Sequence, residues 1–466
     1  MKMREGDSLS LRKFLANTRD LGERYLGGIE ANVRLEDLMA GSTLESPLAL
    51  VSGRSVLLKT RDHFAAALAL VQLDGVARRI VLCPSDVPPD HLAPLIADAE
   101  ADALVTDSND ADTLKQVVAL RIACSPMVGP AAPPPRRSYR TEWLLLTSGT
   151  TGRPKMAVHS LASLTDAIKT RSVRNSSVVW GTFYDIRRYG GLQIYLRALL
   201  GGASLVLPGA CEPVAAFVAR LKHHGVTHLS GTPSHWRRVL MLPANELSDL
   251  RYVRLSGEIA DQTLLDGLKR AYPLAKIDHA YASTEAGVVF HIDDGLEGWP
   301  AALLNSQVDD VNIKVVDGTL RVRSRRTASG YAGSKVELLD ADGFIDTGDV
   351  VELRGGRYHF IGRRGGIVNV GGMKVHPEEV ESVINRHPGV RMSLVRARKN
   401  PFTGAVVIAD VLLNDQAEAD ERGHEVEQEI LQLCRDTLPE HKVPALIRFV
   451  PNLEVAATGK LVRSHA

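Results

Sequence analysis

A loop of hydroxyl, glycine and cationic residues follows an apolar run in the first third of the chain. Three leucines at 144–146 lead into Thr147–Lys155, which reads T-S-G-T-T-G-R-P-K. Glycine lets backbone N–H groups approach an anion, hydroxyls donate hydrogen bonds to phosphate oxygens, and lysine supplies charge. This is not a Walker A motif, because Arg153 and Pro154 separate Gly152 from Lys155. The loop predicts phosphate binding without a P-loop helix, and a polar turn is the alternative. Its candidate contacts are Thr147, Ser148, Gly149, Thr150, Thr151, Gly152 and Lys155.

Further short segments carry residues suited to nucleotide chemistry. They are Y-A-S-T-E at 281–285, T-G-D at 347–349, G-R at 362–363, G-G-M-K-V at 371–375, P-E-E-V-E at 377–381 and T-G-K at 458–460. In this order and spacing, together with the 147–155 loop, they resemble the acyl-adenylate-forming superfamily. That superfamily includes acyl- and aryl-CoA synthetases, adenylation domains of peptide synthetases and firefly luciferase. The resemblance runs from about Pro47 to the C-terminus.

The resemblance implies a two-step reaction that uses ATP, Mg²⁺ and either CoA or a carrier-protein phosphopantetheine. A carboxylate attacks the α-phosphorus of ATP and pyrophosphate leaves. A thiol then attacks the acyl-adenylate and AMP leaves. The 147–155 loop would hold the phosphates of the leaving pyrophosphate, although Lys155 alone also fits a solvated surface lysine.

The resemblance also assigns roles to individual residues. Lys460 would bridge the attacking carboxylate and the α-phosphate, where a preplaced cation stabilises developing charge. Thr284 would donate its hydroxyl to the α-phosphate. Glu285 would bind Mg²⁺, which takes one or two carboxylates with phosphates and water. The other implied nucleotide contacts are Gly257, Glu258, Ala280, Tyr281, Ala282, Ser283, Asp349 and Arg363.

Three of these contacts have a specific physical reason. Asp349 offers two oxygens, enough for the ribose diol, and Arg363 would be a second ribose contact. Tyr281 would lie along the adenine, a role compatible with that of a core tyrosine. In the Ser256–Glu258 turn, Gly257 would let the backbone approach the base.

The segment Phe183–Gly191 corresponds to the acid-binding region of the family. Tyr184, Tyr189 and Gly190, together with Gly257, are the expected lining of the acid pocket. Arg187 or Arg188 would contact an acidic or polar substituent of the acid, or both would be solvated. The region before the phosphate loop is shorter than in most members, which implies a smaller acid-binding side or a different dimer surface.

Two glycine positions concern the C-terminal region. Gly371 and Gly372 would form the wall of the tunnel for the thiol arm. Gly365 stands where most members carry a charged hinge residue. Glycine supplies the backbone freedom that a hinge needs, so we expect Gly365→Pro to stall the thioester step and leave adenylation largely intact.

The elements that must position these residues alternate between strands and helices. Buried strands are predicted at 80–83, 103–105, 143–146, 204–207, 226–229, 252–255 and 276–281, and helices at 91–100, 161–170, 213–224 and 262–271. Residues 129–135 predict an extended connector. The pattern predicts an α/β fold with a large N-terminal domain of stacked βαβ sheets, residues 1–362.

A small mobile α+β domain is predicted at residues 363–466, with its hinge near 363–366. Its expected elements are a helix that begins at 376–379, strands at 393–395 and 405–413, a helix at 425–438 and an irregular tail from Ala445.

Composition restricts the function. The chain has 466 residues, 44% hydrophobic and 24% charged, with a net charge of +1. This balance points to neither a nucleic-acid nor a membrane partner. Residues 1–20 carry no signal-peptide pattern, no apolar run is long enough to span a membrane, and the four cysteines are widely spaced, so a cytoplasmic location is expected.

The sequence favours an acid:CoA ligase for an aryl or short-to-medium acyl acid, with a homodimer as an option. A standalone adenylation enzyme that loads a separate carrier protein is the alternative. The presence of Thr284, Glu285, Asp349 and Lys460 argues against a non-catalytic nucleotide binder. An enzyme whose adenylate is captured by a nitrogen nucleophile stays open. Lys460 would be a target for regulatory acylation, because acylation removes its charge.

Overall fold

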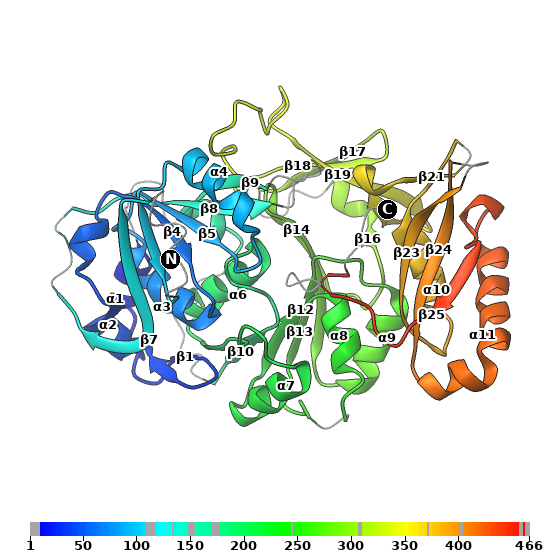
Figure 1. The fold of residues 1–466 in the computed structure, drawn as a ribbon, viewed down its shortest axis with the longest axis horizontal. Coiled ribbons are helices and arrows are strands. Elements are labelled where there is room, and N and C mark those ends of the chain that lie inside the picture. Colours follow the sequence, from blue (N-terminus) through cyan, green and yellow to red (C-terminus); the bar gives the residue numbers. More distant parts are fainter. Residues whose placement is uncertain are drawn as a thin grey trace.

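The computed structural model describes residues 10–108, 118–132, 135, 137–147, 154–168, 177–243, 246–305, 310–370, 372–400, 404–455 and 460–461. These residues form three large sheets and a smaller C-terminal unit, which follow one another across the molecule (Figure 1). The predicted fold class, a large α/β domain followed by a small α+β domain, is confirmed.

The first large sheet has seven strands in the order β3-β7-β6-β4-β5-β8-β9. They are β3 (Gly41–Leu44), β7 (Leu120–Pro130), β6 (Ala103–Thr106), β4 (Ser55–Lys59), β5 (Arg79–Cys83), β8 (Glu142–Thr147) and β9 (Lys155–Ser160). The inner strands are parallel and apolar on both faces, as expected for strands covered on both sides.

The second large sheet has eight strands in the order β15-β14-β13-β12-β10-β11-β1-β2. They are β15 (Gly287–Ile292), β14 (Lys276–Ser283), β13 (Tyr252–Ser256), β12 (His228–Gly231), β10 (Val179–Thr182), β11 (Ser204–Val206), β1 (Tyr25–Gly27) and β2 (Asn32–Arg34). The strands β14 to β1 are parallel, and the two edge strands run antiparallel.

Helices fill the space between these sheets and cover their outer faces. Two of them, α3 (His63–Leu73) and α6 (Tyr189–Leu200), share one apolar core with strands of both sheets. An almost wholly apolar helix such as α3 is stable only when it is buried on all sides. The others in this domain are α1 (Leu11–Ala16), α2 (Leu35–Ala40), α4 (Pro89–Ala99), α5 (Leu161–Thr165), α7 (Val214–His223), α8 (Pro233–Val239) and α9 (Gln262–Ala271).

A third, antiparallel sheet links the large domain to the C-terminal unit. Its order is β16-β20-β19-β18-β17, with β16 (Trp299–Pro300), β20 (Arg357–Arg363), β19 (Ile345–Arg354), β18 (Thr319–Arg323) and β17 (Asn312–Val316). β20 ends at Arg363, and a short 3₁₀ turn, η4 (Arg364–Gly366), follows directly.

The C-terminal unit has a core of its own, formed by residues from Val368 onward. A hairpin of β21 (Val368–Val370) and β22 (Met373–Val375) is followed by α10 (Pro377–Ile384). A sheet of β23 (Val390–Asn400), β24 (Gly404–Leu413) and β25 (Leu446–Phe449) then packs with α11 (Gln416–Thr437). The hinge near 363–366 stays a prediction, consistent with this separate core.

Three local predictions were wrong. The predicted connector begins too early, because Gly129 and Pro130 still belong to β7 and pair with β3. The helix predicted at 161–170 is shorter, because α5 ends at Thr165; residues 169–170 lie outside the described part. The tail from Ala445 is not irregular, because β25 pairs in parallel with β24 and buries Ile447 in the C-terminal core.

All four cysteines are free thiols, three of them buried and Cys211 exposed. Within the described ranges, no helix combines the length and the apolar character that a membrane crossing requires.

Candidate functional site

The predicted phosphate loop connects the two strands of a hairpin. Thr147 ends β8, Lys155 begins β9, and the two residues are register partners. Thr147 is buried and Lys155 is exposed. The predicted contacts between them, Ser148, Gly149, Thr150, Thr151 and Gly152, lie outside the described residues.

Lys155 is joined to Glu285 through an aromatic side chain. Its ammonium lies 5.1 Å from the ring centre of Tyr331, a distance typical of a cation–π contact. The Tyr331 hydroxyl donates to Oε1 of Glu285 over 3.1 Å. Burial, together with the negative charge of Glu285, raises the pKa of Tyr331. The predicted phosphate-binding lysine and the predicted metal-binding carboxylate therefore both contact the side chain of Tyr331.

Thr284 and Glu285 lie in the turn between β14 and β15. Gly287 closes this turn with φ of 78°, and a Cβ there would lie 2.6 Å from the Arg326 backbone oxygen, so only glycine fits. Nε2 of His159 lies 2.7 Å from the Thr284 carbonyl oxygen. Burial lowers the pKa of His159 to about 4, so the ring is neutral near pH 7 and donates this bond.

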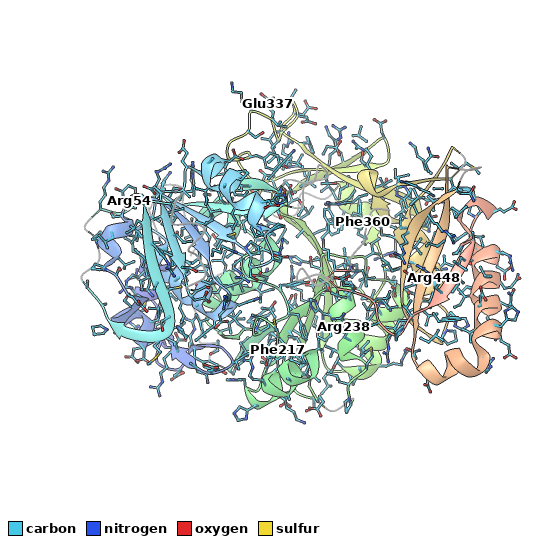
Figure 2. The ribbon with its side chains drawn as sticks, in the orientation of Figure 1. Arg54, Phe217, Arg238, Glu337, Phe360 and Arg448 are labelled. Atoms are coloured by element: carbon cyan, nitrogen blue, oxygen red, sulfur yellow. The ribbon has the colours of Figure 1, made fainter. Side chains whose placement is uncertain are left out.

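On the other side of β14, Tyr281, Asp349 and Arg363 form a chain of hydrogen bonds. The Tyr281 hydroxyl donates to Oδ2 of Asp349, and Nε of Arg363 donates to Oδ1 over 2.8 Å. The Tyr281 ring stacks on Phe360, with centroids 4.7 Å apart, and on Phe290; Figure 2 labels Phe360 near the C-terminal unit. Each Asp349 oxygen keeps a free lone pair, so the carboxylate can still accept ribose hydroxyls.

These hydrogen bonds and charges shift the pKa values of Tyr281 and Arg363. Burial and then the charge of Asp349 raise the pKa of Tyr281 well above its usual value. For Arg363, burial acts to lower the pKa, but the charge and hydrogen bond of Asp349 outweigh it and the pKa is raised. Both side chains are therefore fixed donors to the carboxylate at neutral pH.

The Ser256–Glu258 turn follows β13. Gly257 has φ of 90°, the left-handed conformation that favours glycine. Glu258 accepts hydrogen bonds from the backbone N–H and the hydroxyl of Ser234, over 2.9 and 3.0 Å. The carboxylate therefore fixes the first turn of α8 against this turn, a structural role that the sequence did not suggest.

Lys460 reaches this turn from the C-terminal unit. A Cβ on Gly257 would lie 3.5 Å from Cε of Lys460. Burial of the ammonium lowers the pKa of Lys460; the charge of Glu258 opposes this, and that of Arg363 adds to it. Lys460 and Gly257, which are far apart in the sequence, thus meet where the acid and the α-phosphate are expected.

The predicted acid-pocket residues lie at the start of α6. The Tyr184 hydroxyl donates to the Ser256 carbonyl oxygen over 2.8 Å, and a Cβ on Gly190 would lie 3.8 Å from the Tyr184 ring. Tyr189 is buried, with its ring 5.7 Å from that of His159. The structure therefore gathers Tyr184, Gly190 and Gly257 around one end of β13.

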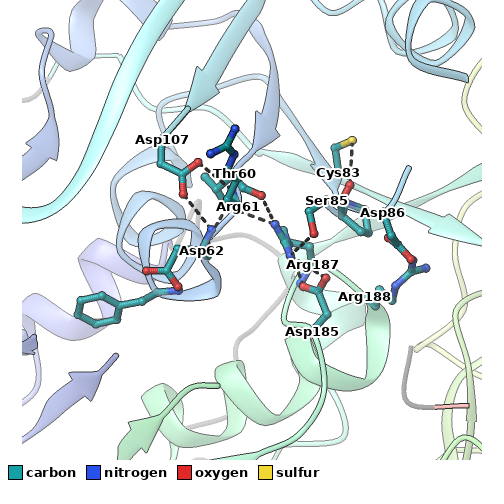
Figure 3. A network of polar contacts seen from close by, with 12 residues as sticks. Thr60, Arg61, Asp62, Cys83, Ser85, Asp86, Asp107, Asp185, Arg187 and Arg188 are labelled. Atoms are coloured by element: carbon teal, nitrogen blue, oxygen red, sulfur yellow. Dashed lines mark hydrogen bonds and ion pairs between the residues drawn. The ribbon is translucent and has the colours of Figure 1, made fainter. Parts of the chain in front are cut away.

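Of the two arginines before α6, Arg187 differs from both sequence-based expectations, whereas Arg188 is partly exposed. Arg187 is fully buried, pairs with Asp185 and donates to the Thr60 carbonyl oxygen (Figure 3). It is neither solvated nor placed to contact a substrate, because its donors are used to join the α6 turn to the end of β4. Arg188 donates to both oxygens of Asp86 over 2.7 Å, and its charge helps to lower the pKa of Lys460.

Gly372 lies in the turn of the β21–β22 hairpin with φ of 89°, and nothing lies within 4 Å of a Cβ placed there. Its partner Gly371 lies outside the described residues. At the hinge, Gly365 belongs to η4 and has no positive φ. Arg364 ties η4 to the five-stranded sheet through Asp346, over 3.0 Å, and Thr319, over 2.9 Å.

Sequence reasoning missed Tyr331, His159 and Arg364. Each acts through a partner that lies far away in the sequence, so no local motif marks it. The only sequence signal was their position: Tyr331 follows a glycine, and His159 is four residues after the loop.

Comparison with known proteins agrees with this geometry. Residues 55–332 match the family described as AMP-binding enzyme, and residues 379–460 match the AMP-binding enzyme C-terminal domain. The human mitochondrial acyl-coenzyme A synthetase ACSM2B is 28% identical over 365 residues, 70% of this chain and 61% of the synthetase. Tyrocidine synthase 3 of Brevibacillus parabrevis is 25% identical over 81% of this chain and 6% of its own length.

The chain thus spans about three fifths of the length of the synthetase that it matches. Solved structures show the same fold. The anthranilate CoA ligase AuaEII in complex with anthranoyl-AMP superposes with a TM-score of 0.79 at 19% identity, over 97% of this chain and 95% of the ligase. The amide bond synthetase McbA from Marinactinospora thermotolerans gives 0.74 at 22% identity, over 97% of each chain. Because the first family match alone covers more than half of the sequence, the chain belongs to the AMP-binding enzyme family.

Proposed function

We propose that this protein activates a small carboxylic acid with ATP and then transfers the acyl group to a thiol. The observation that carries the proposal is the position of Lys460 beside Gly257, where the charges of Asp349 and Arg363 also act on its ammonium. A cation from one domain and a nucleotide-type site on the other are what adenylation requires.

In the first step a carboxylate oxygen attacks the α-phosphorus, and the bond to the pyrophosphate oxygen breaks. Negative charge gathers between the carboxylate and the phosphorus, where Lys460 stabilises it more strongly than it stabilises the separate substrates. Asp349 and Arg363 orient the ribose, and Lys155 holds the leaving phosphates.

Glu285 is the residue that would hold Mg²⁺, and the donor set fits. A single carboxylate suits Mg²⁺ where phosphates and water supply the other ligands. Tyr331 uses one lone pair of Oε1 and so orients the carboxylate without blocking it. When bound, the ion neutralises phosphate charge.

In the second step the thiol sulfur attacks the acyl carbon and AMP leaves. CoA is the acceptor favoured by the relationship to acyl-coenzyme A synthetases, whose names state that activity. A carrier-protein phosphopantetheine is the alternative, supported by the relationship to peptide synthetases. The turn at Gly372 would approach the site after rotation of the C-terminal unit about η4.

Acid-dependent release of pyrophosphate from ATP and Mg²⁺ tests the first step. We expect release with one class of acid, and a loss of about 100- to 1000-fold in Lys460→Ala with ATP binding retained. Equal release by the variant, or ATP hydrolysis that does not depend on an acid, would contradict the proposal. Formation of acyl-CoA against acyl-carrier protein then distinguishes the acceptors.

A further inference from the structure

The strands beneath the predicted acid pocket have two very different faces. Leu229, Val253 and Leu255 point into the apolar core shared with α7, α8 and α9. The alternate positions point toward α6, and they are polar: Ser230, Arg254 and Asp278 are direct register neighbours on β12, β13 and β14. A sheet covered by helices on both faces normally buries apolar residues on both.

Helix α6 presents a matching polar row. Tyr189, Gln193 and Arg197 follow one another at intervals of four residues and so share a face of the helix. Nε2 of Gln193 donates to the Leu164 carbonyl oxygen over 2.8 Å, but its buried Oε1 has no partner. We call Gln193, Arg197, Ser230, Arg254 and Asp278 the Arg197 cluster.

The cluster contains unused hydrogen-bonding groups. Nε and Nη2 of Arg197 are buried without a hydrogen-bond partner among the described residues. The hydroxyl of the fully buried Ser230 also makes no hydrogen bond at ordinary distance there, but it lies close enough to the Tyr184 hydroxyl to act to lower the pKa of that group. Buried polar groups in folded proteins nearly always have a partner, so several unpartnered groups at one place point to a ligand.

The charges in the cluster do not balance either. Arg254 lies 3.6 Å from Asp278 and donates to His291 over 2.9 Å, so its charge is matched. Among the described residues, Arg197 makes no ion pair with a carboxylate, although the charge of Asp278, which pairs with Arg254, also acts to raise the pKa of Arg197. Burial lowers its pKa to about 10, and the nearby positive charge of Arg254 adds to the lowering. The two arginines therefore share one carboxylate, and the partly buried Arg197 lacks a counter-charge of its own, which a ligand carboxylate would supply.

The cluster is aligned with the reaction site. Arg254 is two residues below Ser256 on β13, roughly 7 Å along the strand, and Ser256 precedes Gly257 beside Lys460. Arg197 is two turns below Tyr189 on α6, about 12 Å along the helix. An acid with its reacting carboxylate at Lys460 would therefore need to extend by roughly 7 Å along β13 for its far end to reach the cluster.

We propose that the acid is a dicarboxylic acid whose second carboxylate is bound by Arg197 and Ser230. This inference rests on the proposed function and adds the substrate class to it. One carboxylate accepts from Nε and Nη2 of Arg197, in the paired geometry that suits a guanidinium, and cancels the extra charge. The Ser230 hydroxyl supplies a further donor. Arg197 and Ser230 are thus specificity-determining residues.

The test compares straight-chain diacids from succinate to sebacate with the monocarboxylic acids of equal length. We expect an intermediate diacid to exceed its monoacid partner in kcat/KM for pyrophosphate release by about 100-fold or more. Arg197→Met should reduce the diacid value by about 100-fold, leave the monoacid value unchanged or higher, and so abolish the preference. Arg251→Met is the matched control, because this exposed arginine lies beside the same strand.

A binding measurement keeps this inference separate from the proposed function. Without ATP, the preferred diacid should raise the melting temperature of the wild-type protein and not that of Arg197→Met. The unliganded variant should itself melt higher than wild type, because it lacks the unpaired charge. Arg197→Lys should keep a preference for diacids if the methionine variant does not fold.

Two outcomes would overturn the inference: equal use of monoacids and diacids by the wild-type protein, or an equal loss on both in Arg197→Met. If no acid releases pyrophosphate, the proposed function fails. The melting measurements then decide the inference alone, and the absence of a diacid-dependent shift contradicts it.

Discussion

At the scale of single residues, the site is organised by side chains that hold other side chains. Tyr331 positions Glu285, His159 supports the backbone of Thr284, and Asp349 receives both Tyr281 and Arg363. None of these contacts is made between neighbours in the sequence. Precise placement of the reacting groups therefore depends on the tertiary structure of several strands.

Replacement of Tyr331 by phenylalanine isolates one such contact. The change removes the hydrogen bond to Glu285 and keeps the ring beneath Lys155. A hydrogen bond to a charged acceptor contributes about 1.5 kcal/mol or more, so we expect about a 10-fold lower rate of adenylation and a higher Mg²⁺ requirement. Pyrophosphate release against Mg²⁺ concentration measures both. Tyr331→Leu, which also loses the ring, should lower the rate of adenylation further. An unchanged rate and Mg²⁺ requirement in Tyr331→Phe would refute the role of Tyr331 in positioning Glu285.

At the scale of elements, we expect the short turn η4, at the predicted hinge, to influence how the C-terminal unit presents Lys460. Arg364 anchors η4 to β18 and β19 through Thr319 and Asp346. The Arg364 side chain is largely exposed, so this tether contributes at most about 1 kcal/mol. A tether of that size biases an equilibrium between two domain positions without locking either.

Arg364→Ala should therefore slow adenylation by a few-fold, because the position that seats Lys460 loses its tether, and should not slow the thioester step. Rapid-quench measurement of the two half-reactions separates these effects. Arg325→Ala, which loses an exposed ion pair with Asp310 on the same sheet side, should alter neither half-reaction. A slower thioester step in Arg364→Ala would contradict this reading of η4.

For Gly365→Pro we still expect a stalled thioester step with adenylation largely retained. The structure adds a complication, since proline disfavours the helical conformation of the residue before it, here Arg364 within η4. Gly365→Ala is the control that fits η4. If proline and alanine variants retain both half-reactions equally, rotation does not use Gly365.

At the scale of the whole molecule, buried neutral histidines make stability depend on pH. Burial lowers the pKa of His159 to about 4 and that of His235 to about 3. Below their usual pKa of 6.5 the unfolded chain binds protons that the folded protein does not, so stability is complete above that pH and falls as the solution is acidified. Asp74 acts in the opposite direction, because burial raises its pKa to about 6.

The net loss between neutral pH and about pH 5 should be roughly 3 kcal/mol. Tryptophan fluorescence in urea measures it in the large domain, because Trp143, Trp180, Trp236 and Trp299 all lie there. His159→Gln keeps a donor for Thr284 and cannot be charged, so its denaturation midpoint should depend less on pH. An equal pH dependence in this variant would show that His159 is not one of the groups responsible.

The fold class followed from the sequence because the buried parallel strands read as continuous apolar runs, as in β5 and β8. The antiparallel sheet that contains β16 to β20 was not predicted, since strands such as β17 and β20 are only partly buried and lack a continuous apolar run. The motifs brought Glu285, Asp349 and Lys460 into one expected site, and the structure gathers them. Their roles stay predictions. The burial of Arg187 was missed because its partner Thr60 is far away in sequence.

The bond between Asp349 and Arg363 has a consequence for energetic coupling. Asp349 is the expected ribose acceptor, and Arg363 is the last residue of β20 before η4. If domain position alters this pair, it alters nucleotide affinity, and linkage then requires nucleotide to shift the domain equilibrium by the same factor. A substitution that favours one orientation of the C-terminal unit should thus change the affinity for AMP even when the substituted residue does not contact AMP. The free energy that couples AMP binding to domain position would then influence both product release and domain motion.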